Sequence, residues 1–257
     1  LEAEYLLVMA DANGDLNTRG LIDHAWKDAF WSTQIHPDVR WLASPFRSHP
    51  GFLENGGRYY LDYHDYPEFA TPECASFADA ALYDRVGEDI VAQHFSNLVD
   101  LGVLSRVMIS KRSADYVGNT CGAHENYATD SKVWWSQSQS KLSRVTDELA
   151  SFLVSRALWS GAGSLDDTGA YHMTQKMRLL QRTRGSSTTD DKPIINTREE
   201  HHGDRYRLHL TSGDHNISTW ANAMKLAMTS VALRLIEYGM YPDFAVMNDP
   251  LKAANEL

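Results

Sequence analysis

The chain has 257 residues, a formal net charge of −10, and a composition that is 43% hydrophobic and 23% charged. This size and apolar content allow one large domain or two small ones with a substantial core. The 7 Trp, 12 Tyr and 8 Phe residues exclude a disordered composition. The acidic balance argues against general nucleic-acid binding, for which a basic face is expected.

The cysteines and the apolar runs indicate in which cellular compartment we expect the protein. Cys74 and Cys121 indicate neither a disulfide framework nor a zinc site. No apolar run approaches membrane-spanning length, and no signal peptide is evident. We therefore expect a cytoplasmic protein that binds neither membranes nor nucleic acid.

Hydrophobic periodicity and turn residues predict a mixture of strands and helices. In chain order we expect a strand over residues 1–9, a helix at the start of 21–42, strands over 58–62 and 69–71, a helix over 75–101, a strand over 106–110, a helix over 141–159, strands over 193–197 and 207–211, and a helix over 218–238. We assign the apolar stripe of the last helix to the core: Ile217, Trp220, Met224, Met228, Val231 and Leu235. Antiparallel-looking strands with long helices suggest an α+β fold, in which helices back one sheet.

The segment NGGRYYLD, followed by YPEFATPEC, places acids beside residues that favour strands. Because side chains alternate along a strand, Arg58, Tyr60 and Asp62 share one face, and Glu68 returns after a turn. Clustered carboxylates are unfavourable unless a cation lies among them, and oxygen ligands favour magnesium or manganese. A solvated strand edge is the alternative interpretation of this segment alone.

Four further clusters carry groups that suit metal or phosphate chemistry: Glu2 with Glu4, the GAHENY segment around His124, Arg198 directly after PIINT, and Arg207 with His209. Each is weak alone, since acids on a strand are usually just exposed and a lone His is more often structural. Together, acids for magnesium and Arg and His for phosphates match ATP-dependent phosphoryl transfer. The chain contains no Walker loop, kinase glycine-rich loop or GxGxxG, which favours a glutamine-synthetase-like ATP site on a sheet.

The chain resembles the Pup ligases and the related depupylase/deamidase Dop, which act on the prokaryotic ubiquitin-like protein Pup. The matching segments, in the family's order and spacing, are LEAEY, NGGRYYLD, YPEFATPEC, GNTCGAHENY, FLVSRALWSGAG, KPIINTREE, YRLHLTSGDHN and MKLAM. The resemblance implies an α+β, glutamine-synthetase-like fold with a curved, mostly antiparallel sheet cradle backed by helices. It also implies a single catalytic domain over residues 1–257, with the family's small C-terminal domain largely absent.

The resemblance further implies the reaction. Pup ligases transfer the ATP γ-phosphate to the side-chain carboxylate of the C-terminal Glu of Pup, and a protein lysine attacks the acyl phosphate to form an isopeptide bond. The implied cofactors are ATP and Mg²⁺. The implied partners are a Pup-like modifier and target-protein lysines, with an indirect link to a proteasome.

By position, the resemblance assigns Glu2, Tyr60 and Glu68 to magnesium and the nucleotide phosphates. His124 becomes a further metal or phosphate contact. Asp62 becomes the catalytic residue, which acts as a base toward the incoming lysine.

The resemblance also assigns Arg198 and His209 to the phosphates, and Lys176 to the nucleotide. Lys176 stands where the family has the Arg of Ser-Gln-Arg, so a forked group is replaced by a point charge. Leu6 replaces a usual Gly, and KRSAD at residues 111–115 replaces Lys-Asn-Asn-Thr-Asp. These departures bear on nucleotide affinity and partner choice more than on the core chemistry.

Two features favour the ligase branch. Asp62 and Glu68 are six residues apart, a ligase-like spacing that is one residue shorter in depupylases. The first strand and the Asn-Gly-x-Arg segment also leave little room for the long insertion of depupylases. The alternatives are a depupylase/deamidase of the same family, another ATP-dependent carboxylate–amine ligase, and a non-catalytic relative that binds a tag. Retention of Glu2, Tyr60, Asp62 and Glu68 argues against the last.

Overall fold

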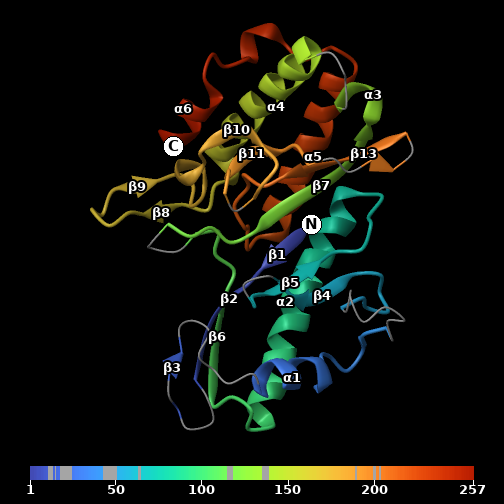
Figure 1. Ribbon diagram of the computed structural model, residues 1–257, viewed down its shortest axis with the longest axis vertical. Helices are drawn as coiled ribbons and strands as arrows, with labels where there is room; N and C mark the ends of the chain where they lie inside the picture. Colours follow the sequence, from blue (N-terminus) through green and yellow to red (C-terminus); the bar gives the residue numbers. More distant parts are fainter. Residues whose placement is uncertain are drawn as a thin grey trace. The chain divides into compact units, whose positions relative to one another are not determined.

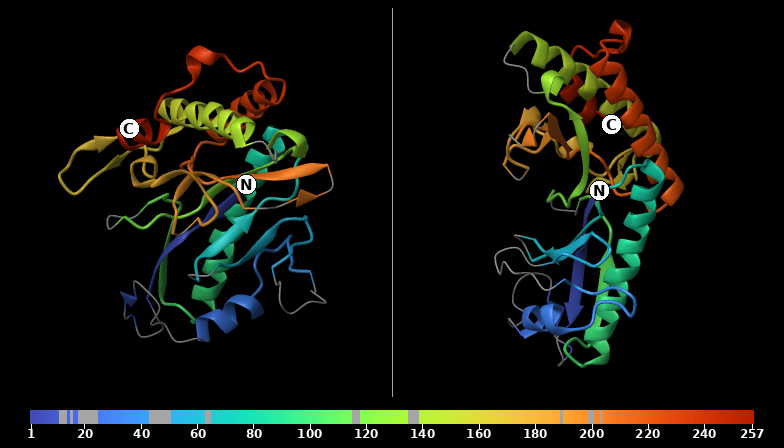
Figure 2. Two further views of the ribbon diagram at one scale, coloured as in Figure 1. Left: turned by 45° about the horizontal axis from the view of Figure 1, so that its top comes forward. Right: turned by 90° about the vertical axis from the view of Figure 1, so that its right-hand side faces the viewer.

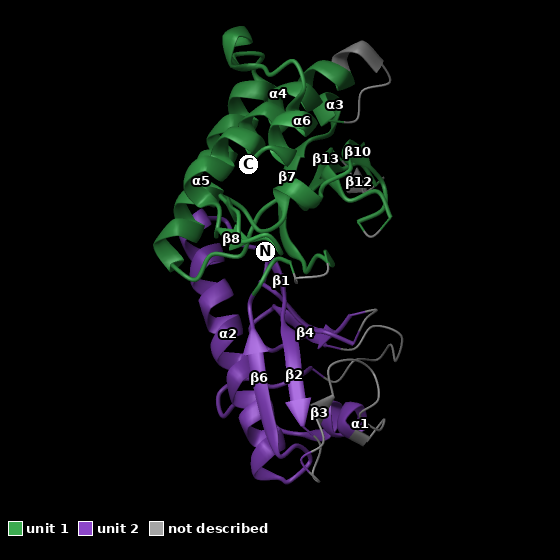
Figure 3. Cartoon of the chain, turned by 90° about the vertical axis from the view of Figure 1, so that its left-hand side faces the viewer, with its two compact units in different colours: residues 1, 112–257 green, residues 2–111 purple. Residues whose placement is uncertain are grey.

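The computed structural model divides the chain into unit 2, residues 2–111, and unit 1, residues 112–257 with Leu1 (Figure 3). The structure describes residues 1–10, 14, 16–17, 25–42, 51–62, 65–114, 118–134, 139–188, 190–198, 201–202 and 204–257. Each unit combines helices with strands (Figures 1 and 2). None of the helices in this part of the chain has both the length and the hydropathy that a membrane span needs. The single catalytic domain expected over residues 1–257 stays a prediction.

The strands of unit 2 form two antiparallel groups. β1 (Glu2–Glu4), β5 (Pro67–Ala70) and β4 (Arg58–Leu61) pair in the order β1-β5-β4. β3 (Leu16–Asn17), β2 (Leu6–Ala10) and β6 (Arg106–Ser110) pair in the order β3-β2-β6. The strand expected over residues 1–9 is therefore two strands, which meet at Tyr5, whose N–H donates to the carbonyl of Pro67.

The core of unit 2 lies on one face of the β1-β5-β4 group. Tyr59 and Phe69 point into it, together with residues of α1 (Ala25–Ser32) and α2 (Phe77–Asp100). The hydroxyl of Ser76 caps α2 by accepting the N–H of Asp79 at 3.1 Å. Because side chains alternate along a strand, the aromatic residues enter the core and Tyr60 and Glu68 lie on the other face.

Unit 1 is built on a mostly antiparallel group of strands. The order is β10 (Arg182–Gly185), β11 (Pro193–Asn196), β13 (Arg205–Leu210) and β7 (Ala123–Asp130), with β12 (His201–His202) paired to β13. Only β10 and β11 run parallel among these described pairs. α4 (Gln139–Ser160) packs against α5 (Thr219–Glu237) and β11, and α5 also contacts β7. The smaller elements are α3 (Ser131–Trp134), β8 (Ser164–Leu165), β9 (Tyr171–His172), η1 (Met177–Leu179), η2 (Asp243–Ala245) and α6 (Pro250–Asn255).

Most expected elements are confirmed to within a few residues. The helices expected over 75–101, 141–159 and 218–238 are α2, α4 and α5, and the strand expected over 106–110 is β6. The start of the helix expected from residue 21 lies outside the described residues, and α1 covers part of the remainder. The sequence does not predict β7, because its polar sequence AHENYATD shows little apolar alternation.

The assignment of the apolar stripe of α5 to the core is wrong. The buried face of α5 instead carries Asn222, Lys225, Leu226, Thr229, Ala232, Leu233 and Ile236. The ammonium of Lys225 donates to the carbonyl of Asp214 at 2.9 Å. The hydroxyl of Thr229 lies 2.7 Å from Nη1 of Arg156. Buried polar groups need partners, so these contacts turn the polar residues inward and leave the stripe outside.

Gly87, within α2, is required by the contact with β5. A Cβ at this position would lie 2.2 Å from Cδ1 of Phe69. Replacing a helical Gly by Ala usually gains about 1 kcal/mol. Here we expect Gly87→Ala to lower the free energy of unfolding by about 1–3 kcal/mol, because the site is overpacked.

Urea unfolding measures this loss in the wild-type and Phe69→Leu backgrounds. The smaller side chain should relieve most of it. An equal loss in both backgrounds would show that the Phe69 contact is not the cause.

Candidate functional site

One face of the β1-β5-β4 group concentrates carboxylates. Carboxylate oxygens of Glu4, Asp62 and Glu68 all lie within 4.8 Å of one another. Glu4 stands opposite Glu68, and Glu68 stands opposite Tyr60, so the three side chains share a face. Glu2 lies on that face as well, because it is two residues from Glu4 on the same strand. Glu4 is not among the ligands expected from the sequence, although its Glu-x-Glu spacing from Glu2 places it on the same strand face.

The electrostatics of this face favour a bound cation. Glu68 is 6% exposed, and its burial raises the pKa of its carboxyl to about 8, with Glu2 and Glu4 raising it further. Burial also raises the pKa of Tyr60, and neighbouring Glu68 adds to the shift, so the phenol keeps its proton. A cation would let Glu68 ionise. An all-oxygen donor set fits the expected Mg²⁺.

Asp62 is held at the end of β4. Its Oδ1 accepts the N–H of Tyr66 at 2.8 Å, and its own N–H donates to the carbonyl of Tyr66 at 2.9 Å. Two residues earlier, the Tyr60 ring lies under the guanidinium of Arg58, with 4.0 Å from Cζ to the ring centroid. The expectation that Arg58, Tyr60 and Asp62 share one face therefore agrees with the geometry.

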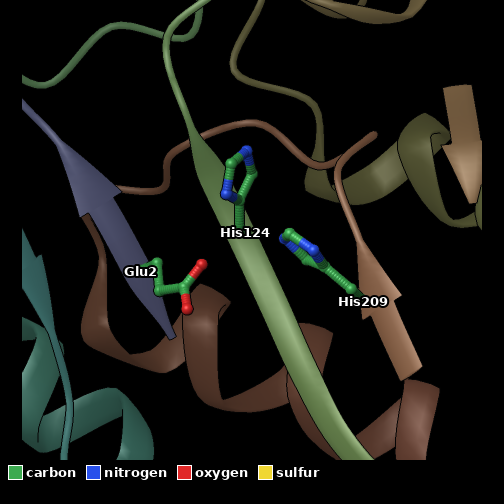
Figure 4. A group of neighbouring side chains, drawn as sticks. All are labelled: Glu2, His124 and His209. Atoms are coloured by element: carbon green, nitrogen blue, oxygen red, sulfur yellow. The ribbon is translucent and has the colours of Figure 1, made fainter. Parts of the chain in front are cut away.

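A second group lies in unit 1. The imidazole rings of His124 on β7 and His209 on β13 lie in an edge-to-face contact, with centroids 4.8 Å apart and an interplanar angle of 75° (Figure 4). Nδ2 of Asn196 lies 3.4 Å from Nδ1 of His209. Oδ1 of Asn196 accepts the N–H of Arg198 at 2.8 Å. Asn196, which the sequence analysis did not single out, thus links His209 to the backbone of Arg198.

The opposite face of β7 is anchored by a buried ion pair. Nη1 and Nη2 of Arg156 donate to the two carboxylate oxygens of Glu125 at 2.8 and 2.9 Å. The hydroxyl of Tyr127 donates to Glu125 at 2.7 Å. Burial alone would raise the pKa of Glu125, but Arg156 and Lys225 hold it below its usual value. The pair fixes the strand, so His124 must project from the other face.

Lys176 lies in the interior of unit 1, with its ammonium 3.4 Å from the carbonyl of Cys121. Its position depends on Asp214. The carboxylate of Asp214 accepts backbone N–H groups from Ala162, Gln175 and Lys176 at 3.0, 2.9 and 3.2 Å. Asp214 is a positioning residue that the sequence analysis missed.

The expected site residues therefore form one group in each unit. Glu2, Tyr60, Asp62 and Glu68 share a face in unit 2. His124 and His209 adjoin each other in unit 1, while Arg198 is exposed just after β11. Asp115, within the divergent KRSAD run, lies outside the described residues.

The chain matches known proteins along most of its length. A family model described as "Pup-ligase protein" matches residues 9–257. The chain is 37% identical over 221 residues to a Pup–protein ligase of Acidimicrobium ferrooxidans, and 36% identical over 221 residues to one of Kineococcus radiotolerans. Each match covers 82% of this chain and 47% of the relative. The chain thus spans about half the length of the curated relatives it matches.

Solved structures of the Pup ligase PafA are also similar. The complex of Pup with PafA gives a TM-score of 0.69 at 26% identity, covering 99% of this chain and 49% of that chain. The complex of PafA with ADP gives a TM-score of 0.63 at 28% identity, covering 82% of this chain and 47% of that chain. These matches confirm the expected α+β, glutamine-synthetase-like fold and the resemblance to the Pup ligases.

The raised pKa of Glu68 predicts a pH-dependent stability. In the unfolded chain the pKa of this carboxyl is near its usual value of 4.5, but in the folded chain it is about 8. Its contribution to stability is therefore fully present below about pH 4.5 and is lost as the pH rises through 8. Without divalent cations, we expect the melting temperature to fall between pH 6 and pH 8.5.

Calorimetry with and without Mg²⁺ measures this effect. Mg²⁺ should raise the melting temperature more at pH 8.5 than at pH 6, because it favours ionised Glu68. In Glu68→Gln, the fall in melting temperature between pH 6 and pH 8.5 should be smaller, and so should the extra stabilisation by Mg²⁺ at pH 8.5. The same pH dependence in Glu68→Gln as in the wild type would assign it to other groups.

Proposed function

Because the chain belongs to the Pup-ligase family, we propose that it takes part in ATP-dependent ligation of a Pup-like modifier. The reaction would phosphorylate the side-chain carboxylate of the modifier's C-terminal Glu and join it to a protein lysine through an isopeptide bond. The single observation that carries the proposal is the carboxylate face formed by Glu4, Asp62 and Glu68. Such a face needs cations, and a phosphoryl-transfer site needs magnesium.

The carboxylate face supplies the magnesium ligands in this proposal. Glu2, Glu4 and Glu68 would hold Mg²⁺ through carboxylate oxygens, with Tyr60 placed against Glu68. A Mg²⁺ ion held there would supply positive charge to neutralise the phosphates during transfer. The hydrogen bond that Tyr60 gives to Glu68 orients that carboxylate.

Four further residues are proposed as phosphate contacts. We assign this role to His124, Lys176, Arg198 and His209. The support is the chemistry of these groups and their order: the two imidazoles lie side by side, and Asn196 connects His209 to Arg198. Lys176 offers a point charge rather than a fork, and its buried ammonium is held near the carbonyl of Cys121.

Asp62 is proposed as the base toward lysine. A lysine ammonium is not nucleophilic until it loses a proton, and a positioned carboxylate can accept that proton. The bond from the Tyr66 N–H fixes one carboxylate oxygen of Asp62. Its closeness to Glu4 and Glu68 leaves a second role, as a metal ligand, which the first experiment below separates from the base role.

The known structures of PafA with Pup and with ADP support the proposed partner and nucleotide. We further propose ATP and Mg²⁺ as cofactors and protein lysines as acceptors. The expected setting is the cytoplasm, with an indirect link to a proteasome. Removal of a modifier, as in the depupylases, is the alternative activity. The gel-shift assay described below would detect it as loss of the conjugate.

Asp62→Asn separates acyl-phosphate formation from amine capture. The amide keeps the oxygen that accepts the Tyr66 N–H but loses the base. We expect ATP binding to persist and conjugation to fall by about 10²–10⁴. Gel-shift conjugation of a modifier ending in Glu, with calorimetric ATP binding in parallel, measures both.

Asp89→Asn, at an exposed aspartate of α2, serves as the control and should leave ATP binding and conjugation unchanged. Loss of ATP binding together with conjugation would make Asp62 a metal ligand. Efficient conjugation by Asp62→Asn would remove it from the mechanism.

Arg198→Lys tests the phosphate contact. If Arg198 gives a forked hydrogen bond to a phosphoryl group, the variant loses a charged hydrogen bond of about 1.5–3 kcal/mol. We then expect kcat to fall by roughly 10–100-fold. If Arg198 is a solvated surface group, the change should stay within about 0–1 kcal/mol.

Single-turnover ATP consumption in the presence of the modifier measures the rate. Arg184→Lys, at an exposed arginine on β10, provides the matched control. A wild-type rate for Arg198→Lys, like that of the control, would place Arg198 outside the phosphate site.

A further inference from the structure

α2 contacts β5 and β4 from the core side of the β1-β5-β4 group (Figure 1). Gly87 of α2 packs against the Phe69 ring on β5. His94, about two helical turns later on the same side of α2, is hydrogen-bonded to Tyr59 on β4, with 3.1 Å between Nδ1 and the phenol oxygen. Tyr59 and Phe69 stand opposite each other in the register of the two strands. The helix therefore holds both strands at one position of their register.

The hydrogen bond between His94 and Tyr59 is fully buried, since both residues are 0% exposed. Burial lowers the pKa of His94 to about 4 and raises the pKa of Tyr59, so both side chains are neutral near pH 7. A neutral imidazole has one donor and one acceptor nitrogen, and a phenol can serve as either partner. Because buried polar groups need partners, this bond determines where the Tyr59 hydroxyl lies.

Aromatic rings hold the imidazole of His94 in one orientation. It lies edge-to-face against Phe30, with 4.6 Å between the ring centroids. It also lies edge-to-face against Trp41, with 5.5 Å between the centroids and 85° between the planes. Phe95 approaches it to 5.9 Å. A close-packed interior leaves little room for another rotamer, so His94 presents Nδ1 to Tyr59 as a fixed group.

The backbone of Tyr59 is held as well. Its N–H donates to the carbonyl of Gly51 at 2.7 Å, and its carbonyl accepts the indole N–H of Trp41 at 3.0 Å. These bonds support β4 on the side away from β5, which is its one partner among the described strands. An edge strand has no second strand to fix it, so the contacts of Tyr59 take over that task.

We propose that His94 is a positioning residue for the carboxylate face and that it acts through Tyr59. Tyr60 follows Tyr59 directly and points to the other face of β4, where it stands opposite Glu68 and gives that carboxylate a hydrogen bond. Because a planar peptide joins the two tyrosines, a shift of Tyr59 also shifts Tyr60. This role presupposes the proposed function, in which Glu68 is a magnesium ligand.

Space filling is the competing explanation, because His94 is packed among aromatic rings. The two explanations differ in how stability and metal affinity change together. If His94 only fills space, a variant that regains stability also regains metal binding. If the hydrogen bond positions Tyr60, metal binding stays weak even where stability is regained.

Tyr59→Phe removes the hydroxyl and keeps the ring. We expect it to lower stability and to weaken Mn²⁺ binding by about three- to tenfold, because the orientation of Glu68 is loosened. Mn²⁺ suits the same oxygen ligands as Mg²⁺, and electron paramagnetic resonance measures the free ion. Binding that is lost in Glu68→Gln identifies the carboxylate face, and urea unfolding measures stability in parallel.

Tyr59→Phe/His94→Leu separates positioning from space filling. Replacing both partners of a buried hydrogen bond by apolar groups of similar size can leave stability nearly unchanged. We therefore expect the double variant to regain most of the stability lost in Tyr59→Phe, yet to bind Mn²⁺ about as weakly as Tyr59→Phe. Ile35→Val, which removes a methylene from the same core, is the control. It should lower stability and bind Mn²⁺ like the wild type.

The outcomes distinguish the positioning role from the proposed function. Wild-type Mn²⁺ affinity in Tyr59→Phe, or affinity that returns with stability in the double variant, overturns the positioning role alone. Equal weakening in Ile35→Val overturns it too, because general destabilisation would then explain the effect. A wild-type chain that binds no Mn²⁺ contradicts the proposed function and the positioning role with it. If circular dichroism shows that the double variant does not fold, Tyr59→Phe against Ile35→Val decides.

Discussion

Mutual repulsion among the carboxylates of the β1-β5-β4 group is the constraint on which the proposed function depends. Glu4, Asp62 and Glu68 approach within 4.8 Å of one another, although burial and their own charges hold the pKa of Glu68 near 8. The sheet tolerates this arrangement because its other face carries Tyr59 and Phe69 in the core. Because side chains alternate along a strand, the same short strands carry buried aromatic residues on one face and mutually repelling carboxylates on the other.

Unit 1 also buries a carboxylate, that of Glu125, but there an arginine compensates its charge. Glu125 is even more deeply buried than Glu68, but Arg156 binds both of its carboxylate oxygens, and the pKa of Glu125 falls below the usual value. A buried carboxylate with an arginine beside it stays ionised without a metal ion, because the opposite charge favours the charged form. The pKa of Glu68 shifts the other way because its close neighbours are further acids. This contrast, rather than acidity as such, distinguishes the candidate metal face from the ion pair that anchors β7.

The sequence predicts the parts of this architecture that local pattern determines. The helix expected over residues 75–101 is α2, and the shared face of Arg58, Tyr60 and Asp62 follows from alternation. Glu4 was visible in the Glu-x-Glu spacing, yet nothing local shows that β5 lies beside β1 and brings Glu68 to it. Register between strands far apart in the chain depends on tertiary packing. Asn196 and Asp214 were missed for the same reason, since each acts on residues brought close only by folding.

The face that α5 buries differs from the one that hydrophobic periodicity predicts. Periodicity identifies an apolar face and, by default, turns it toward the core. Here the polar face carries Lys225 and Thr229, whose partners Asp214 and Arg156 are themselves buried. Turning this polar face to solvent would remove these hydrogen bonds from buried partners, and each unsatisfied buried polar group costs about 1–3 kcal/mol. A helix packed over a polar network therefore leaves its apolar residues outside, and the stripe that resembles a core in the sequence becomes a surface.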